Sequence, residues 1–266
     1  MNSLRTGAIE RGAGGAPRRI EILPDGDALA LRAADLFALA AQEAAAARGR
    51  FAVALSGGET PRALYRLLAR QQFSQKVPWR RVQLYWGDER CVPPDDAQSN
   101  YGMARDAFIK HVPIAAENVH RMRGEDPPEE AAKAYDAELR GLAARERPLV
   151  DVPVFDLVLL GLGTDGHTAS LFPHGDALAV EDSFAVPTAA PDGSPRLTVT
   201  APVINAARRV WFLVSGARKA GMVAEVLEGL RVPNAVPAQG VAPVHGALTW
   251  FLDEAAAAEL SSDVRA

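Results

Sequence analysis

Residues 154–174 read VFDLVLLGLGTDGHTASLFPH. The first seven, Val154 to Leu160, are largely apolar, which is typical of a strand buried on both faces of a parallel sheet. The chain then breaks into glycine and delivers Asp165 and His167. Because open α/β sheets bind ligands at the carboxyl ends of their strands, we expect a functional site in residues 161–170, with His167 at its centre.

A second strand candidate, Phe51–Leu55, runs directly into SGGETP at residues 56–61. Adjacent glycines let main-chain N–H groups approach a ligand, and we expect Thr60 to cap the following helix. A strand, a glycine turn and a helix N-terminus form an anion site, usually for phosphate, although a tight turn with ordinary capping is the alternative. The loop is neither a Walker A nor a GxGxxG sequence, so it does not indicate ATP or a dinucleotide. The candidate binding residues are Ser56, Gly57, Gly58 and Thr60.

Two further strand candidates end in charged or small residues. Arg81–Trp86 leads into Asp88, Glu89 and Arg90, and Val210–Val214 leads into Ser215, Gly216 and then Lys219. An arginine in such a place binds a phosphate or a carboxylate through two parallel hydrogen bonds. A surface cluster of ion pairs is the commoner role of an Asp-Glu-Arg triplet, so both interpretations stay open.

The composition excludes several classes of protein. The 266 residues are 48% hydrophobic with a formal net charge of −4, which allows a sizeable core and does not indicate a nucleic acid or a membrane surface as partner. Cys91 is the single cysteine, so an intrachain disulfide and a Cys-rich metal site are excluded, and we expect a reducing compartment, the cytoplasm. We find no signal peptide and no apolar run of the ~20 residues that a membrane span needs.

Strand and helix patterns alternate through most of the chain. They predict an α/β fold with a doubly wound, mostly parallel sheet flanked by helices, of Rossmann-like type. We expect helices over residues 27–48 and 128–145, an irregular stretch from Pro173 to Pro195, a strand over Arg196–Thr200 and a terminal alanine-rich helix capped by Asp253. A single domain is expected over residues 19–262, after a disordered N-terminal tail of residues 1–18.

Three blocks of this sequence, in order, resemble the 6-phosphogluconolactonases. They are SGGETP at 56–61, WGDER at 86–90 followed by SNY at 99–101, and GLGTDGHTASLFP at 161–173. That family shares its fold with the glucosamine-6-phosphate deaminases, which typically follow Asp-Gly-His with Ile-Ala-Phe-Asn-Glu-Pro and carry Asp-Glu-Tyr. This chain has Thr-Ala-Ser-Leu-Phe-Pro and Arg90 instead. The resemblance therefore favours the lactonase branch.

The resemblance implies hydrolysis of 6-phospho-D-glucono-1,5-lactone to 6-phospho-D-gluconate, the second step of the oxidative pentose phosphate pathway, with no metal and no other cofactor. His167 would be the base that activates water, because histidine changes its charge near neutral pH. Asp165 would orient the imidazole or hold the water. The resemblance makes Arg90 and Lys219 the better phosphate anchors beside the glycine loop. It leaves open which cation stabilises the lactone oxygen. The further candidate binding residues are Arg196, Asp88 and Asn100.

Two other functions remain as alternatives. One is a glucosamine-6-phosphate deaminase or isomerase, which ammonia release would reveal. The other is a sugar-phosphate-sensing module without catalysis, which would bind 6-phosphogluconate without turnover. The expected partner is a small-molecule substrate rather than nucleic acid or membrane, and a monomer and a homodimer both stay open.

Overall fold

The computed structural model describes residues 5–6, 10–11, 17–146 and 152–265. The predicted tail, residues 1–18, lies largely outside the described residues, so its disorder stays a prediction. The part of it that is described comprises two short strands, β1 (Arg5–Thr6) and β2 (Glu10–Arg11), and the start of β3 (Pro17–Leu23). Both short strands pair antiparallel with β3.

Six strands of the described chain run parallel in the central sheet, and all of them except β3, which reads PRRIEIL, are mainly apolar in sequence. Their order is β3-β11-β10-β7-β4-β5. Every residue of β4 and β7 is buried, as expected for strands covered on both faces. The predicted doubly wound parallel sheet is confirmed. Besides β3, its strands are β4 (Phe51–Leu55), β5 (Val82–Trp86), β7 (Leu157–Leu160), β10 (Arg209–Val214) and β11 (Ala247–Asp253).

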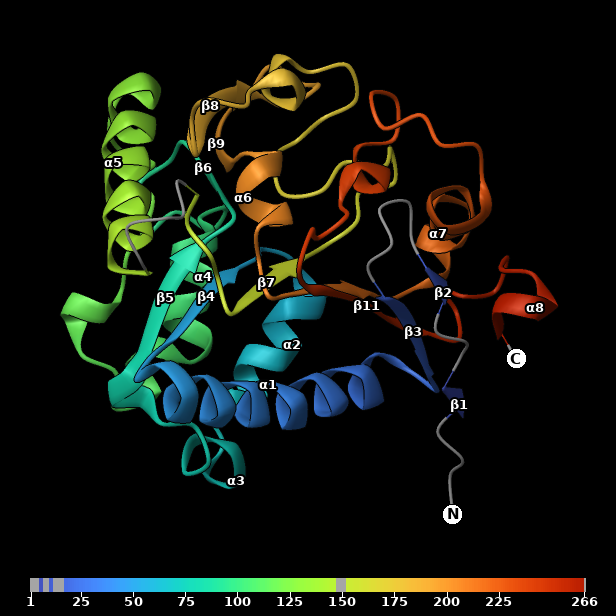
Figure 1. Cartoon of the computed structure of the whole chain (residues 1–266), viewed down its shortest axis with the longest axis horizontal. Helices are drawn as coiled ribbons and strands as arrows, with labels where there is room; N and C mark the ends of the chain where they lie inside the picture. Colours follow the sequence, from blue (N-terminus) through green and yellow to red (C-terminus); the bar gives the residue numbers. More distant parts are fainter. Residues whose placement is uncertain (1–4, 7–9, 12–16, 147–151, 266) are drawn as a thin grey trace.

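Helices cover both faces of this sheet. Figure 1 shows α1 and α2 on one side, and α6 and α7 on the other. The main helices are α1 (Gly26–Arg48), α2 (Glu59–Leu68), α4 (Asn100–Ala107), α5 (Pro128–Glu146), α6 (Ala201–Asn205) and α7 (Ala220–Glu228). Short helices or single turns are α3 (Gln71–Ser74), α8 (Ser262–Arg265), η1 (Trp79–Arg81), η2 (Ile109–His111), η3 (Ala116–Asn118), η4 (Asp176–Ala179), η5 (Ala217–Lys219) and η6 (Pro237–Gly240).

The strand order reverses direction between β4 and β7. From β4 the chain continues outward to β5, and it then returns to place β7 on the opposite side of β4. The loops that leave β4 and β7 therefore diverge at the carboxyl ends of these strands. Such a switch point is where open α/β sheets form a binding crevice.

A second sheet, which the sequence did not predict, lies beside the carboxyl ends of these strands. It has the order β6-β9-β8 and is antiparallel, with β6 (Asp88–Arg90), β9 (Pro195–Val199) and β8 (Ala185–Ala189). The Asp-Glu-Arg triplet was expected to follow a strand, not to form one. The prediction of an irregular stretch from Pro173 to Pro195 is wrong for residues 185–189, which form β8.

Three predicted helix boundaries are also wrong. Asp25 caps α1 instead of Asp27, because its carboxylate accepts a hydrogen bond of 2.8 Å from the N–H of Ala28. Thr60 does not cap α2, which begins after Gly58. The chain after Asp253 forms turns instead of an alanine helix. Even so, the Asp253 carboxylate accepts from the N–H of Ala256 at 2.7 Å, as a cap would.

The strand expected over Val154–Leu160 begins only at Leu157. Asp156 precedes it and is 1% exposed, where it pairs with Arg48 at 2.7 Å and accepts from the N–H of Ala52 at 2.8 Å. This carboxylate thus takes a main-chain hydrogen bond at the entry to the strand. A buried carboxylate of this kind is stable because it is both paired and hydrogen-bonded.

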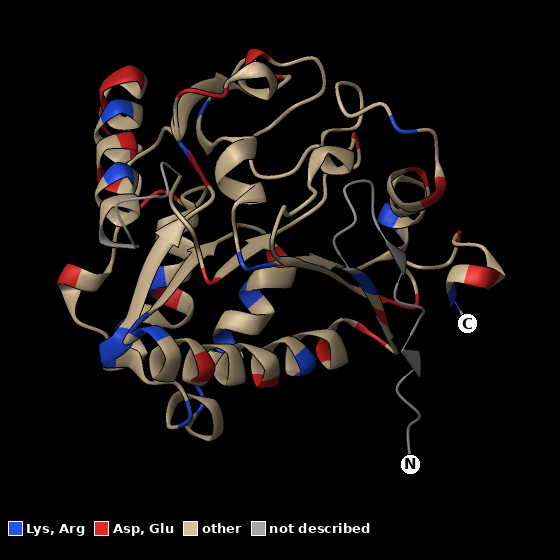
Figure 2. Ribbon diagram, viewed as in Figure 1, with Lys and Arg blue, Asp and Glu red and all other residues tan. Residues whose placement is uncertain are grey.

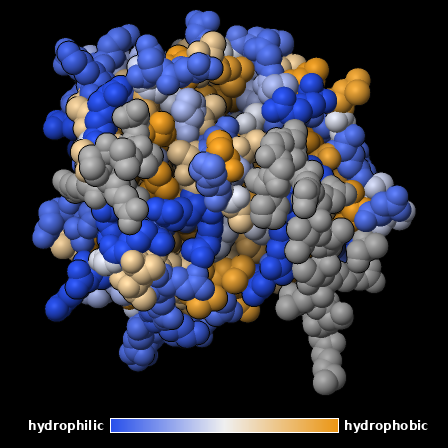
Figure 3. All heavy atoms as spheres, viewed as in Figure 1, coloured by the Kyte–Doolittle hydropathy of each residue, from blue (hydrophilic) through white to orange (hydrophobic). Residues whose placement is uncertain are grey.

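The surface is mixed in charge and polarity. Figure 2 shows both acidic and basic residues along α1 and α5. Hydrophilic residues cover much of the face seen in Figure 3, with smaller hydrophobic areas between them. No helix of the described chain has the length and apolar character to cross a membrane.

Candidate active site

A cleft of about 430 Å³ opens at the carboxyl ends of the central strands, beside the small antiparallel sheet. Its volume falls in the range of small-molecule sites, roughly 300–1,000 Å³. The loops after β4, β7 and β10 supply most of its wall, and β6 and α4 supply the rest. Among the predicted site residues, the lining includes Ser56, Gly57, Gly58, Thr60, Asp88, Arg90, Asn100, His167 and Lys219.

His167 and Asp165 form a pair at the turn after β7. The imidazole Nδ1 lies 2.5 Å from the Asp165 carboxylate, which also accepts the main-chain N–H of His167 at 3.2 Å. An ionised carboxylate only accepts hydrogen bonds, so Nδ1 carries the proton and Nε2 keeps its lone pair. The pair is therefore set up as a base with an orienting group. Asp165 does not line the cleft, but it contacts His167, which does.

Gly163 makes this pairing possible. A Cβ at residue 163 would lie 2.1 Å from Nδ1 of His167 and 2.4 Å from the Asp165 carboxylate, closer than any side chain allows. The turn is held by two main-chain bonds, from Gly163 N–H to the His167 carbonyl at 2.8 Å and from Gly166 N–H to the Gly163 carbonyl at 3.2 Å. On its other side the imidazole contacts the ring of Phe172, with 4.8 Å between ring centres.

The pKa of Asp165 is lowered. Burial alone would raise it, but the charge that His167 gains on protonation and the hydrogen bonds from His167 outweigh the burial. The carboxylate is thus ionised whenever His167 works as a base near neutral pH. It is also positioned to stabilise the imidazolium once His167 has taken up a proton.

The glycine loop after β4 presents its main chain to the cleft. The N–H groups of Gly57 and Gly58 donate to no other group of the described chain. Gly58 has a φ of 99°, a region that favours glycine. The buried hydroxyl of Tyr65 fixes the loop by accepting from Ser56 N–H at 3.0 Å and donating to its carbonyl at 2.8 Å. Two main-chain donors are thus left for an anion at the start of α2.

Thr60 joins this loop to the one after β10. Its hydroxyl lies 2.8 Å from the Ser215 hydroxyl, which explains why it is not a helix cap. Ser215 also lines the cleft, as do Arg218 and Lys219 of η5. The link therefore holds the glycine loop and the cation-bearing loop side by side.

The predicted cations are not equivalent in the structure. Lys219 lines the cleft, and its pKa is lowered by burial and by the charge of Arg218, against the attraction of Asp165. Arg90 also lines the cleft and donates to the carbonyl of Gln98. Arg196 is the cross-strand partner of Arg90, but it does not line the cleft. The sequence did not single out Arg218 as a binding residue.

Asp88 is buried at 8% exposure and accepts hydrogen bonds from two side chains. They are the Ser170 hydroxyl at 2.9 Å and the Asn100 amide at 3.3 Å. The same amide also donates to the Asp88 carbonyl at 2.9 Å, and a Cβ on Gly57 would lie 1.9 Å from the Asn100 amide oxygen. This network ties β6, α4 and the loop of residues 161–170 together at the cleft wall.

Glu89 is a structural centre that the sequence did not reveal. It is 2% exposed, and its carboxylate accepts from the main-chain N–H groups of Arg90, Asn100 and Tyr101 at 2.7–2.8 Å and from the Ser99 hydroxyl at 3.1 Å. Burial raises the pKa of Glu89, and the N–H donors oppose that rise. The sequence feature that could have indicated this role of Glu89 is its position ahead of α4, which Ser99 caps, since a helix N-terminus attracts a carboxylate.

The described chain holds no group of three or more His, Cys, Asp or Glu side chains arranged for a metal ion. Cys91 is half-buried and outside the cleft lining, and burial raises the pKa of its thiol. A raised pKa favours the unreactive thiol over the thiolate. Neither observation gives Cys91 a part in the site.

Comparisons with known proteins show which family this chain is similar to. The model of the glucosamine-6-phosphate isomerase/6-phosphogluconolactonase family matches residues 24–250. A 6-phosphogluconolactonase of Nostoc sp. is 43% identical over 245 residues, which cover 92% of this chain and 99% of that protein. A Synechocystis sp. protein of the same name is 45% identical over 219 residues, covering 82% and 88%. The solved structure of 6-phosphogluconolactonase from Trypanosoma brucei superposes with a TM-score of 0.79 at 27% identity, covering 96% of this chain and 100% of that one.

Proposed function

This chain belongs to the glucosamine-6-phosphate isomerase/6-phosphogluconolactonase family, and we propose that its cleft hydrolyses 6-phosphogluconolactone to 6-phosphogluconate in the pentose phosphate pathway. The observation that carries the proposal is the meeting of the His167–Asp165 pair, a glycine anion loop and the side chains of Arg90, Arg218 and Lys219 at one cleft. A lactone with a phosphate needs these three things: a base, an anion site and positive charge.

In the proposed mechanism, Nε2 of His167 takes a proton from a water molecule as the water oxygen attacks the lactone carbonyl carbon. The Asp165 carboxylate holds Nδ1–H and stabilises the imidazolium that forms. When the tetrahedral intermediate collapses, the bond from that carbon to the ring oxygen breaks. The imidazolium then returns its proton to the ring oxygen, which becomes a hydroxyl of the product.

The phosphate is proposed to lie against the N–H groups of Gly57 and Gly58, with Lys219 beside them. Thr60 and Ser215 hold these two loops together, so that the anion site is formed before substrate arrives. Arg90, on the β6 wall, is the second cation. Arg196 has no place in this assignment, because it lies one strand away from the lining.

Asp88 does not suit a phosphate, because an ionised carboxylate and a phosphate are both negative and repel each other. We propose that Asp88 and Asn100 accept and donate hydrogen bonds to the sugar hydroxyls instead. The Ser170 hydroxyl and the Asn100 amide hold the carboxylate in place for this purpose. We further propose a cytoplasmic location, which the single half-buried Cys91 fits.

The experiment that tests the proposal compares hydrolysis of 6-phosphogluconolactone with that of glucono-1,5-lactone, after subtraction of the spontaneous rate. Loss of the phosphate contacts should lower kcat/KM by about 100-fold, from two charge-assisted hydrogen bonds. Equal rates on both lactones would refute the anion site. Release of ammonia from glucosamine 6-phosphate, without lactone turnover, would instead establish the deaminase alternative.

A further inference from the structure

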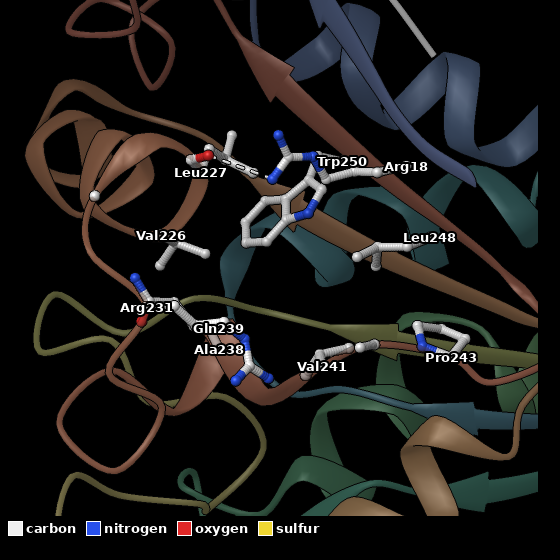
Figure 4. Close-up of a pocket in the computed structure, with 12 residues that line it drawn as sticks. Arg18, Val226, Leu227, Arg231, Ala238, Gln239, Val241, Pro243, Leu248 and Trp250 are labelled. Carbon is white, nitrogen blue, oxygen red and sulfur yellow. Dashed lines mark hydrogen bonds between the residues drawn. The ribbon is translucent and has the colours of Figure 1, made fainter. Parts of the chain in front are cut away.

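A second cavity lies away from the cleft, between β11, the α7 helix and the η6 turn. Its volume is about 160 Å³. The walls are largely apolar, and Figure 4 shows Trp250 and Leu248 on one side, with Val226, Ala238 and Val241 around the rest. A cavity of about 150 Å³ is large enough for a benzene ring.

Two guanidinium groups border this otherwise apolar space. Arg18 lies beside Trp250 and donates to the Leu227 carbonyl at 3.3 Å, the bond drawn as a dashed line in Figure 4. Arg231 lies on the opposite side with Ala238. Arg231 is exposed, and within the described residues no ion pair or hydrogen bond involves its side chain. Positive charge is therefore available at the mouth of the cavity.

A buried donor is also left without an acceptor. Trp250 is 1% exposed and lines the cavity, and its indole Nε1–H has no hydrogen-bond partner in the part of the chain that the structure describes. An unsatisfied buried donor carries a free-energy cost. A ligand with an acceptor oxygen would relieve that cost. The walls, the charges and the donor together fit a small organic anion with a flat apolar body.

The cavity is preformed. The Gln239 side chain holds the loop that carries Arg231, because its oxygen accepts from Val232 N–H at 2.7 Å and its nitrogen donates to the carbonyls of Glu225 and Leu230 at 2.9 and 3.0 Å. The loop is thus tied to α7 across the mouth of the cavity. Little ordering entropy would be lost on binding, which favours affinity.

The same wall also holds the catalytic turn. Ala238 N–H donates to the carbonyl of Gly166 at 3.0 Å, between Asp165 and His167 in the chain. Eight residues beyond Gly166, His174 N–H donates to the Asn234 carbonyl at 2.8 Å. Residues 234–238 therefore hold the loop of residues 166–174 at both of its ends. Helix α7, which forms the facing wall of the cavity, begins directly after Lys219.

We propose that this cavity is a second binding site, for a small aromatic or branched carboxylate, and that its occupancy changes the turnover at the cleft through the Ala238–Gly166 contact. The carboxylate would accept a hydrogen bond from the Trp250 Nε1–H, with the Arg231 guanidinium at the mouth supplying positive charge, and the apolar body would lie against Val226 and Val241. The effect on turnover rests on the proposed function, whereas the binding itself does not.

Benzoate is the probe, and calorimetry with the full chain measures its binding independently of catalysis. We expect saturable binding at one site per chain. Benzamide, which has the same shape and no charge, should bind about tenfold more weakly, and so should benzoate to Arg231→Gln. The matched control is Arg66→Gln, an exposed arginine of α2, which should bind benzoate like the wild type.

Activity is then titrated with benzoate. In the wild type kcat should change by about twofold or more, and Arg231→Gln should start from the wild-type kcat and need about tenfold more benzoate for the same change. Displacement of benzoate by 6-phosphogluconate would place it in the catalytic cleft and overturn the proposal. So would unchanged affinity in Arg231→Gln, or binding that leaves the wild-type kcat as it was. Lactonase activity on its own bears only on the proposed function.

Discussion

The cleft is formed by two regions that hold their polar side chains in opposite ways. On the turn after β7, Asp165 and His167 keep 38% and 33% of their side-chain surface exposed and contact mainly each other. In the small antiparallel sheet, Asp88 and Glu89 are 8% and 2% exposed and accept several hydrogen bonds each. The first region leaves a lone pair accessible to water. The second forms a buried, hydrogen-bonded wall of the cleft, and we propose that this wall sets where the substrate lies.

This contrast predicts different consequences for substitutions in the two regions. Changes on the turn should lower turnover and leave the free energy of unfolding almost unchanged. Changes in the wall should lower the free energy of unfolding first, and affect the reaction through KM.

The largest effect is expected for His167→Ala. Loss of a general base typically lowers kcat by about 10²–10⁴-fold, whereas removal of a one-third-exposed side chain changes folding little. Lactone hydrolysis, corrected for the spontaneous rate, and urea unfolding measure the two quantities. His111→Ala removes an exposed histidine outside the cleft and is the control. A kcat/KM near that of the wild type would remove His167 from the mechanism.

Asp165→Asn should have the next largest effect, about 10²-fold in kcat, because an amide no longer fixes the proton on Nδ1. The same substitution should also change how the free energy of unfolding depends on pH in the acidic range. The pKa of Asp165 is lowered in the folded protein, so the stability it contributes is present above its ordinary pKa and is lost as the pH falls through the lowered one. Unfolding midpoints of the variant should therefore fall less on acidification. Parallel curves for both proteins would contradict this.

Lys219→Gln tests the cation beside the glycine loop. We expect KM to rise by about 10-fold or more, with a smaller change in kcat, as for a lost phosphate contact. Since the pKa of Lys219 is lowered by burial and by Arg218, the cation loses its proton at a lower pH than an ordinary lysine. Activity should thus decline early on the alkaline side, and Lys219→Arg should move that decline to higher pH. A loss confined to kcat would indicate oxyanion stabilisation instead.

Glu89→Ala should reverse the pattern of His167→Ala. It leaves three main-chain N–H groups and the Ser99 hydroxyl without an acceptor, at a cost of about 3 kcal/mol in the free energy of unfolding. Glu89→Gln keeps the shape and should lose about half as much. The activity lost by Glu89→Ala should appear in KM, because Arg90 and Asn100 shift, and Glu89→Gln should restore most of it.

The pH dependence of the free energy of unfolding should distinguish the titrating carboxylate of Glu89 from the neutral amide of Glu89→Gln. Burial raises the pKa of Glu89, so its contribution to stability is complete below the ordinary pKa and is lost as the pH rises through the raised value. The side chain of Glu89→Gln stays neutral throughout. The stability deficit of this variant should therefore narrow as the pH increases, and a constant deficit would contradict the direction of the shift.

The smallest effect is expected for Arg196→Ala. Its side chain lies one strand beyond the cleft lining, so KM should stay within about twofold of the wild-type value, as is usual for a residue with no ligand contact. Arg90→Ala is the matched comparison across the same strand pair, and its KM should rise. Equal losses in the two variants would show that β9 also belongs to the binding wall.

Much of the parallel sheet could be predicted from the sequence, because strands such as FAVAL and VWFLV are apolar without interruption and end in glycine or serine. The small sheet could not. Its strand β6 is three charged residues with no alternation, and only the pairing with Arg196–Thr198 gives it a register. Asp156 was hidden in the same way, since its burial depends on Arg48, far away in the chain.

For the site, the sequence predicted the residues on glycine turns, where a special backbone is visible in the amino acids themselves. The residue pattern alone did not separate Arg90 from Arg196, because a cation's distance from a cleft is set by strand order, and only the family resemblance favoured Arg90. Nor did it reveal Glu89 or Tyr65, whose partners are main-chain groups that carry no side-chain signature. Roles that depend on tertiary contacts with the backbone are invisible in composition and spacing.

The pairing of β3 with β11 has a consequence for biosynthesis. Ile20 and Trp250 are register partners, so the parallel neighbour of β3 is β11, the last strand of the described chain and more than 200 residues away in sequence. During translation β3 waits with that side of its backbone unpaired while β4, β5 and β7 can already associate. Closure of this side of the sheet therefore waits for residues 247–253 and depends on long-range contacts, and a nascent chain halted before residue 247 should remain a client of chaperones.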